Sequence, residues 1–247
     1  MSPTRISDNV TFGLKQGLAS ILPGRCYACS GPCEALRALC IPCERDLRHN
    51  TLPCDRCGAP HRAPRCQRCR IRIEPFEGVL APLVFNGPIR ELLHHWKFNR
   101  CLELTPVLSR FVAQAIIKHS VQADCLVPIT SHWWRRWRRG FEPIGILANE
   151  TSHQLATLGV SLPVVQALYR VRHTRAQHRS SYLQRDAQLS GVFQSRQPLS
   201  GKSVVLLDDV MTSGATARHA STALLEAGVS RVIFAAIART AGESESE

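Results

Sequence analysis

The 247-residue sequence contains no run of about eighteen apolar residues, the length that a membrane-spanning helix needs. Its N-terminus also lacks the short apolar core and small-residue cleavage site of a secretory signal peptide. These absences predict a cytoplasmic protein without membrane insertion. Residues 10–22 have the pattern of a short amphipathic helix, so we assign residues 1–24 to an N-terminal helix that packs on its own domain.

Acidic residues are few, with 19 Asp and Glu against 31 Lys and Arg, and the net charge is +12. Three of the glutamates lie in the final GESESE, within residues 241–247, which we expect to form a disordered acidic tail. The excess of positive charge favours anionic partners, including nucleic acids and polyphosphates, but does not distinguish between them.

Two sequence motifs of nucleotide and DNA binding are missing. There is no GxxxxGK[ST] loop, which argues against a P-loop ATPase. There is also no pair of histidines at zinc-finger spacing followed by a recognition helix, which argues against a finger-type DNA-binding regulator. Any nucleotide or nucleic acid chemistry must therefore come from other motifs.

Eleven cysteines are present, and nine of them lie between residues 26 and 69. Eight form four CxxC pairs: Cys26 and Cys29, Cys40 and Cys43, Cys54 and Cys57, Cys66 and Cys69. Two such pairs complete a tetrahedral four-thiolate zinc site, so we predict two structural zinc ions in a double zinc ribbon over residues 25–75. Pairing in sequence order is the simplest assignment, and interleaved pairing stays open. A disulfide framework would require a secreted chain.

After Cys69 the CxxC pairs stop, and apolar strands alternate with helical patterns over residues 76–240. Expected strands cover 78–85, 124–129, 163–169, 204–207 and 231–238, and expected helices cover 88–97, 102–119, 141–158 and 215–225. This alternation predicts an α/β domain with a doubly wound, mostly parallel sheet. Within helix 88–97, His94 and His95 are interpreted as surface or packing residues.

Residues 204–216, VVLLDDVMTSGAT, place two acids after an apolar strand and a small-residue loop before a helix. The loop residues Thr212, Ser213, Gly214, Ala215 and Thr216 suit a phosphate, because N–H groups are free at a helix N-terminus and glycine permits close approach. Asp208 and Asp209 would repel a phosphate, so they suit ribose hydroxyls or Mg²⁺. The alternative is an ordinary strand-to-helix turn whose polar residues only cap the helix.

Two further stretches carry candidate anion contacts. Residues 131–141, SHWWRRWRRGF, contain Arg135, Arg136, Arg138 and Arg139, which suit a diphosphate or, with the tryptophans, stacked single-stranded bases. Residues 170–193 include Arg175 and Gln177 and are long for a plain connection, which suggests a lid, a nucleic-acid-contacting arm or a solvated excursion. For the first stretch, a solvated basic face with inward tryptophans stays the alternative.

The DDVMTSGAT loop resembles that of type I phosphoribosyltransferases, which implies that Asp208 and Asp209 contact the ribose of Mg²⁺-bound phosphoribosyl pyrophosphate (PRPP) and that residues 212–216 hold its 5-phosphate. With the cysteine-rich ribbon, LLHHWKFNR and RRGF, nearly the whole chain resembles the ComF family of competence-associated proteins. That resemblance implies handling of internalised single-stranded DNA in natural transformation, alongside a competence helicase and other uptake proteins.

One motif departs from the family pattern. Family members usually have RGFNQ, whereas Glu142 and Pro143 follow Gly140 and Phe141 here. If the missing amides only serve the start of the next helix, Glu and Pro replace them adequately. If they bind substrate, the chain binds differently, and a non-catalytic adaptor that binds PRPP or nucleic acid is the alternative function.

Overall fold

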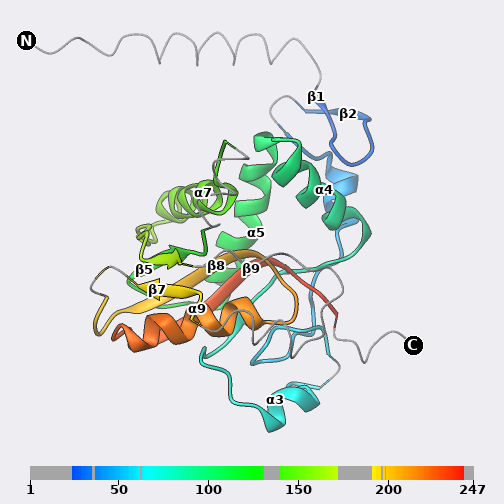
Figure 1. Cartoon of the computed structure of the whole chain (residues 1–247). Helices are drawn as coiled ribbons and strands as arrows, with labels where there is room; N and C mark the ends of the chain where they lie inside the picture. Colours follow the sequence, from blue (N-terminus) through cyan, green and yellow to red (C-terminus); the bar gives the residue numbers. More distant parts are fainter. Residues whose placement is uncertain are drawn as a thin grey trace, which may run out of the picture.

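The computed structural model describes residues 24–34, 37–61, 63–130, 140–171, 191–195, 197 and 199–241. A central sheet lies between helices on both of its faces, and the cysteine-rich segment lies along the outside of this domain (Figure 1). The predicted doubly wound α/β class is therefore confirmed for the described part of the chain.

The central sheet is parallel, with strand order β3-β9-β8-β5 and with β4 also paired to β9. Its strands are β3 (Val79–Leu80), β4 (Leu83–Val84), β5 (Cys125–Pro128), β8 (Ser203–Met211) and β9 (Arg231–Arg239). Strand β8 is buried on both faces: Val204 and Leu206 belong to one core cluster, and Val205 and Leu207 to the other. Burial on both sides explains the unbroken apolar run that the sequence shows there.

The helices divide between the two cores. They are α4 (Gly87–Phe98), the 3-10 turn η1 (Leu102–Leu104), α5 (Thr105–Lys118), α7 (Pro143–Thr157) and α9 (Ala215–Glu226). Helices α4, α5 and α7 pack in the cluster of Val205 and Leu207, whereas α9 packs in the cluster of Val204 and Leu206. Proline in the first turn of α4, α5 and α7 suits positions whose N–H has no partner within the helix.

The short elements lie at the edges of the fold. They are β1 (Gly24–Arg25) with β2 (Pro32–Cys33), α2 (Ile41–Arg45), α3 (Gln67–Ile71), and β6 (Leu168–Arg170) with β7 (Phe193–Ser195). Cys26, Leu39 and Leu47 share the core cluster of α4 and α5. A separate small cluster contains Ala59 and four cysteines, Cys54, Cys57, Cys66 and Cys69. Figure 1 places β1 and β2 at one end of the molecule and α3 at the other.

Three predicted elements differ from the structure. The strand expected over 163–169 does not join the central sheet as a continuous strand: Val164 makes an isolated bridge with Leu126, and only the end of the range belongs to β6, which pairs with β7 outside that sheet. The strand expected over 78–85 divides into β3 and β4 around Pro82, a residue without an N–H for the ladder. Strand β8 continues to Met211 instead of ending at Leu207, because β9 remains its partner through Arg239.

Several predictions fall on residues outside the described part of the chain. These are the N-terminal helix except for its last residue, most of the acidic tail, and most of the two basic stretches, including residues 131–139 and 172–190. Within the described residues, no helix has the length and apolar character to cross a membrane. The domain boundaries at 25–75 and 76–240 stay predictions.

Candidate functional site

The two acids lie where the central sheet loses one of its strands. The pairing of β5 with β8 ends at Pro128 and Leu207, whereas β8 and β9 stay paired through Met211. Asp208 and Asp209 therefore sit on a strand that has passed its neighbour, and both are partly exposed. In parallel α/β sheets, this carboxyl-terminal edge is where ligands bind.

The acids make their hydrogen bonds within the strand and do not cap α9. The N–H of Asp209 donates to Asp208 Oδ1 at 2.9 Å, and the N–H of Val210 donates to Asp209 Oδ1 at 2.6 Å. Lys97 Nζ forms an ion pair with Asp209 Oδ2. The capping explanation thus does not account for these carboxylates.

Burial and repulsion from Asp209 raise the pKa of Asp208 to about 8, although Lys97, the N–H of Asp209 and Arg170 act in the opposite direction. Near neutral pH the acid pair thus retains a proton, because one lysine does not balance two partly buried carboxylates. A cation or a ligand with hydroxyl donors would relieve this repulsion.

Lys97 is a site residue that the residue-by-residue interpretation missed. Its neighbour Trp96 is fully buried and donates from Nε1 to Thr105 Oγ1 at 3.0 Å, which fixes α4 against α5. This packing directs Lys97, on the next position of α4, towards Asp209. The motif LLHHWKFNR, which contains Lys97, contributes to the family resemblance, and it is the sequence feature that could have indicated a site residue here.

The backbone of the loop is held through its carbonyl groups. Arg239 Nη1 donates to the carbonyl of Met211 at 3.0 Å and to that of Thr212, and Arg68 Nη2 donates to the carbonyl of Ser213 at 2.9 Å. None of the described peptide bonds is cis, so each carbonyl lies opposite the N–H of the next residue. The N–H groups of residues 212–214 therefore face away from these arginines, as in an anion-binding nest.

Gly214 joins this loop to α9. Its φ of 78° lies in the left-handed region, and a Cβ built there would be 2.9 Å from Met211 Cε and 3.4 Å from Arg218 Nη1. Backbone conformation and space thus both favour glycine. Helix α9 begins at Ala215, so its first N–H groups extend the donor set of the loop.

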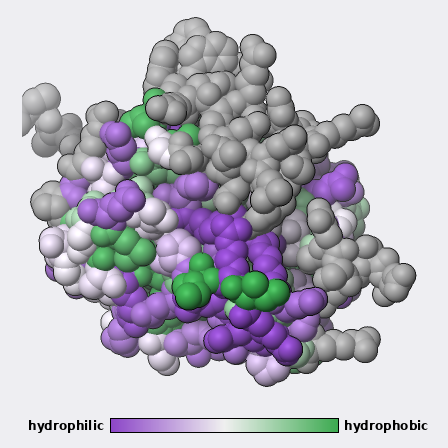
Figure 2. Space-filling view, turned by 60° about the horizontal axis from the view of Figure 1, so that its bottom comes forward, coloured by the Kyte–Doolittle hydropathy of each residue, from purple (hydrophilic) through white to green (hydrophobic). Residues whose placement is uncertain are grey.

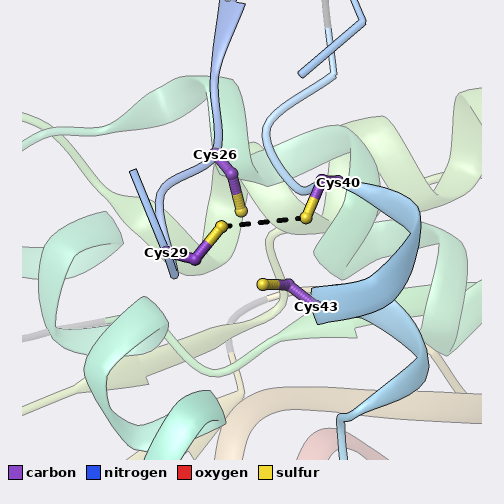
Figure 3. A group of neighbouring side chains, drawn as sticks. All are labelled: Cys26, Cys29, Cys40 and Cys43. Atoms are coloured by element: carbon purple, nitrogen blue, oxygen red, sulfur yellow. Dashed lines mark hydrogen bonds between the residues drawn. The ribbon is translucent and has the colours of Figure 1, made fainter. Parts of the chain in front are cut away.

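The cysteines gather in two groups in sequence order, Cys26, Cys29, Cys40 and Cys43 in one and Cys54, Cys57, Cys66 and Cys69 in the other, with all Sγ atoms of a group within 4.8 Å of one another. We call these groups the first and second tetrads. The Sγ atoms of Cys29 and Cys40 are 3.9 Å apart (Figure 3), and those of Cys57 and Cys66 are 3.8 Å apart. Zinc with Zn–S bonds of about 2.3 Å in tetrahedral geometry places its sulfurs about 3.8 Å apart, so both tetrads fit zinc.

Each tetrad contains one readily ionised thiol. Burial acts to raise the pKa of Cys26, but backbone hydrogen bonds outweigh it and lower that pKa to about 6. The same balance lowers the pKa of Cys54 to about 7, and the N–H of Cys66 donates to Cys54 Sγ at 3.4 Å. Hydrogen bonds from its neighbouring cysteines raise the pKa of Cys43, and burial raises that of Cys69. Metal binding would displace these protons. Cys33, buried nearby, belongs to neither tetrad.

The predicted anion contacts in the two basic stretches lie outside the described part of the chain, so the structure does not place them at the site. These residues are Arg135, Arg136, Arg138, Arg139, Arg175 and Gln177. Glu142 is the N-cap residue of α7, and Pro143 is in its first turn. These two residues therefore stand at the start of the helix, although the Glu142 side chain makes no capping hydrogen bond, and the effect of replacing the amides stays open.

The phosphoribosyl transferase domain family matches residues 138–247. The DNA utilization protein YhgH of Salmonella typhimurium is 29% identical over 227 residues, covering 89% of this chain and 98% of that protein, and YhgH of Escherichia coli strain K12 matches with the same figures. Competence protein F of Haemophilus influenzae is 25% identical over 227 residues, covering 87% and 96%. These homologues confirm the predicted resemblance to ComF proteins, and the match to the phosphoribosyl transferase domain confirms the predicted fold class.

Among solved structures, the chain is similar to glutamine PRPP amidotransferase from B. subtilis, with a TM-score of 0.35 and 22% identity over 53% of this chain and 25% of that chain. Orotate phosphoribosyltransferase of Francisella tularensis matches with a TM-score of 0.33 and 18% identity, over 55% of this chain and 66% of that one. This chain therefore spans a quarter of the first structure and about two thirds of the second.

We predict that the purified protein binds about two zinc ions per chain, one in each four-thiolate group. Cys29→Ser and Cys66→Ser should each reduce the zinc content to about one, because each removes a ligand from a different tetrad. Cys33→Ser is the matched control and should retain about two. Zinc measured by elemental analysis against protein concentration tests this, and joint loss of both ions in either variant would contradict independent sites.

The raised pKa of Asp208 predicts a pH-dependent stability. Between the ordinary carboxyl range and about pH 8, the folded chain holds a proton that the unfolded chain has lost, so the wild type loses stability as pH rises. Asp208→Asn cannot ionise, so its melting temperature should rise relative to wild type between pH 5 and pH 8 and level off above. Thermal melts across this range measure the difference.

Asp124→Asn is the control for that series. The N–H of Ser203 and then Lys202 lower the pKa of Asp124, so its contribution is complete above the ordinary carboxyl range. Its difference in melting temperature from wild type should therefore stay constant from pH 5 to pH 8. A constant difference for Asp208→Asn as well would contradict the predicted shift.

Proposed function

We propose that this chain, which carries a phosphoribosyl transferase domain, binds PRPP with Mg²⁺ at the end of β8. The observation that carries the proposal is the loop after β8: Arg239 and Arg68 bind the carbonyls of residues 211–213, and the N–H groups of residues 212–214 face the opposite side. That N–H face and the start of α9 would hold the 5-phosphate, with Ser213, Ala215 and the hydroxyls of Thr212 and Thr216 around it.

The acids would take the sugar half of the ligand. Asp208 and Asp209 are unsuited to phosphate, but their oxygens accept hydrogen bonds from ribose hydroxyls and are ligands of the type that Mg²⁺ prefers. The proton retained by Asp208 would leave on binding, because the ligand brings the missing donors or cation. Lys97, which pairs with Asp209, would be released to contact the pyrophosphate once that pair opens.

The names of the homologues support a setting for this site. They are a DNA utilization protein and a competence protein. We infer that the chain acts in the cytoplasm on single-stranded DNA entering during natural transformation, with a competence helicase and other uptake proteins as partners. If transfer occurs, a nucleophile attacks the anomeric carbon of PRPP and pyrophosphate leaves. We assign no general base.

A non-catalytic adaptor that binds PRPP or nucleic acid is the second candidate, and the surface around α3 favours it. Arg65 and Arg70 are exposed there, and Ile71 and Ile73 are 82% and 90% exposed. Figure 2, in which the lower end of Figure 1 comes forward, shows hydrophobic atoms surrounded by hydrophilic ones. A positively charged surface with exposed apolar side chains suits a flexible polyanion such as single-stranded nucleic acid.

Calorimetric titration of Mg²⁺-PRPP into the protein tests ligand binding. We expect saturable binding to wild type and at least about tenfold weaker binding to the Asp208→Asn, Asp209→Asn double variant, since charge-assisted hydrogen bonds to the sugar are weakened. Asp124→Asn, an exposed acid paired with Lys202, is the matched control and should bind as wild type does. Absence of binding to wild type, or equal affinity for the double variant, would refute the assignment.

Nucleic acid binding is tested separately with a fluorescent single-stranded oligonucleotide. Replacing Arg135, Arg136, Arg138 and Arg139 with Ala should weaken binding and flatten its salt dependence, because each phosphate contact releases counterions. Arg110→Ala, which removes an arginine paired with Glu44, is the control for charge alone. An unchanged salt slope in the fourfold variant would eliminate this stretch as the DNA contact.

A further inference from the structure

We propose that the second tetrad positions the sugar-phosphate loop, so that metal binding to Cys54, Cys57, Cys66 and Cys69 sets the affinity of the loop for its ligand. Arg68 and Arg239 are the positioning residues that connect the two. The identity of the ligand rests on the proposed function, whereas the link between the second tetrad and the loop rests on contacts within the chain.

The first connection runs through Arg239, at the end of β9. Its side chain is almost fully buried and spans the gap between tetrad and loop: Nε donates to the carbonyl of Cys57 at 3.0 Å, and Nη1 donates to the carbonyls of Met211 and Thr212. A buried guanidinium needs all of these acceptors, since burying a charge without partners is costly. Displacing Cys57 would therefore disturb the loop carbonyls as well.

The second connection runs through Arg68, which lies between Cys66 and Cys69 in the CxxC turn. Its Nη2 donates to the carbonyl of Ser213 at 2.9 Å and to Glu74 Oε1 at 3.3 Å. The Glu74 side chain is fully buried and also accepts from Arg218 Nη1 of α9 at 3.3 Å. One turn of the ribbon thus reaches both the loop and the helix that follows it.

The other CxxC turn of the same tetrad supports this arrangement. Arg56, between Cys54 and Cys57, donates to the backbone carbonyl of Glu74 at 2.7 Å. Both turns therefore place an arginine directly before their second cysteine and direct it to Glu74. The geometry of the two turns determines where Glu74, and with it Arg218 and Arg68, can lie.

The first tetrad has a different set of neighbours. Tyr27 donates to Glu103 Oε2 at 3.2 Å near η1, and Glu44 pairs with Arg37 and with Arg110 of α5. These contacts anchor it beside the helices on the far side of the molecule from α3 (Figure 1). In the described part of the chain, residues 211–213 receive hydrogen bonds from Arg68 of the second tetrad's segment and from Arg239 and Thr240 at the end of β9.

Metal is required for this support because the second tetrad has almost no core of its own. Its cluster contains only the four cysteines and Ala59. Segments of this kind keep their fold through the metal–thiolate bonds. Loss of the ion would release Arg68 and the Cys57 carbonyl, and the N–H face of residues 212–214 would lose its fixed direction. By linkage, ligand binding would in turn increase metal affinity at this tetrad.

The test compares Cys66→Ser, Arg68→Gln and Arg45→Gln, with zinc content, hydrogen exchange of residues 212–216 and Mg²⁺-PRPP affinity measured for each. Cys66→Ser should lose one zinc, exchange its loop amides about tenfold faster and bind PRPP about tenfold more weakly. Arg68→Gln should keep both zinc ions but show the same two effects on the loop. Arg45→Gln removes an exposed charge from α2, the short helix of the first tetrad, and should match wild type in all three measurements.

Wild-type exchange and affinity in Arg68→Gln would overturn the inference. If Cys66→Ser fails to fold, Arg68→Gln still decides, because its metal site is complete. If wild-type protein binds no PRPP, the proposed function fails, whereas the exchange of residues 212–216 continues to test the connection. Faster exchange in Arg45→Gln as well would mean that loss of any positive charge has this effect, and would also overturn the inference.

Discussion

The hydrogen bonds from the buried Arg239 and the partly buried Arg68 to the backbone carbonyls of residues 211–213 are the interaction on which the candidate site depends. A loop of small residues has little side chain with which to hold itself, so its conformation is imposed from outside by Arg239 and Arg68. Since a trans peptide fixes the N–H opposite its carbonyl, holding one face of the loop orients the other. In the proposed anion site, the donors would be backbone N–H groups, and the two arginines would orient them without contacting the anion.

A difference in strand length leaves the two acids beyond the end of a neighbouring strand. Strand β5 ends its pairing at Leu207, while β9 accompanies β8 to Met211, so Asp208 and Asp209 lie on a strand that is supported on one side. There the acids remain partly exposed and repel one another, and Lys97 compensates only in part. The strain of two close carboxylates is the property that a ligand with hydroxyl donors or Mg²⁺ can relieve.

The two tetrads have similar chemistry but different positions in the fold. One shares the core of α4 and α5, and the other joins the loop of β8 to the end of β9 through arginines. A four-thiolate site is closed and carries no reaction of its own. Its influence on a neighbouring site therefore depends on the contacts that its CxxC turns make. In the second tetrad, the arginine before the second cysteine of each turn donates a hydrogen bond to a backbone carbonyl outside the turn.

Local sequence determined the features that depend on neighbours along the chain. Periodicity predicted α4, α5, α7 and α9 and the strands at 204 and 231, and CxxC spacing predicted the cysteine groups, because a turn brings residues three apart to one metal. Strand partners were less predictable: nothing near residue 164 indicates that it makes only a bridge, and nothing near Leu207 indicates that β9 prolongs β8. The roles of Lys97, Arg68 and Arg239 were decided by tertiary structure alone. Lys97 and Arg68 contact residues more than a hundred positions away, and Arg239 contacts Met211, 28 positions away. Local sequence patterns carry no signal of contacts at such separations.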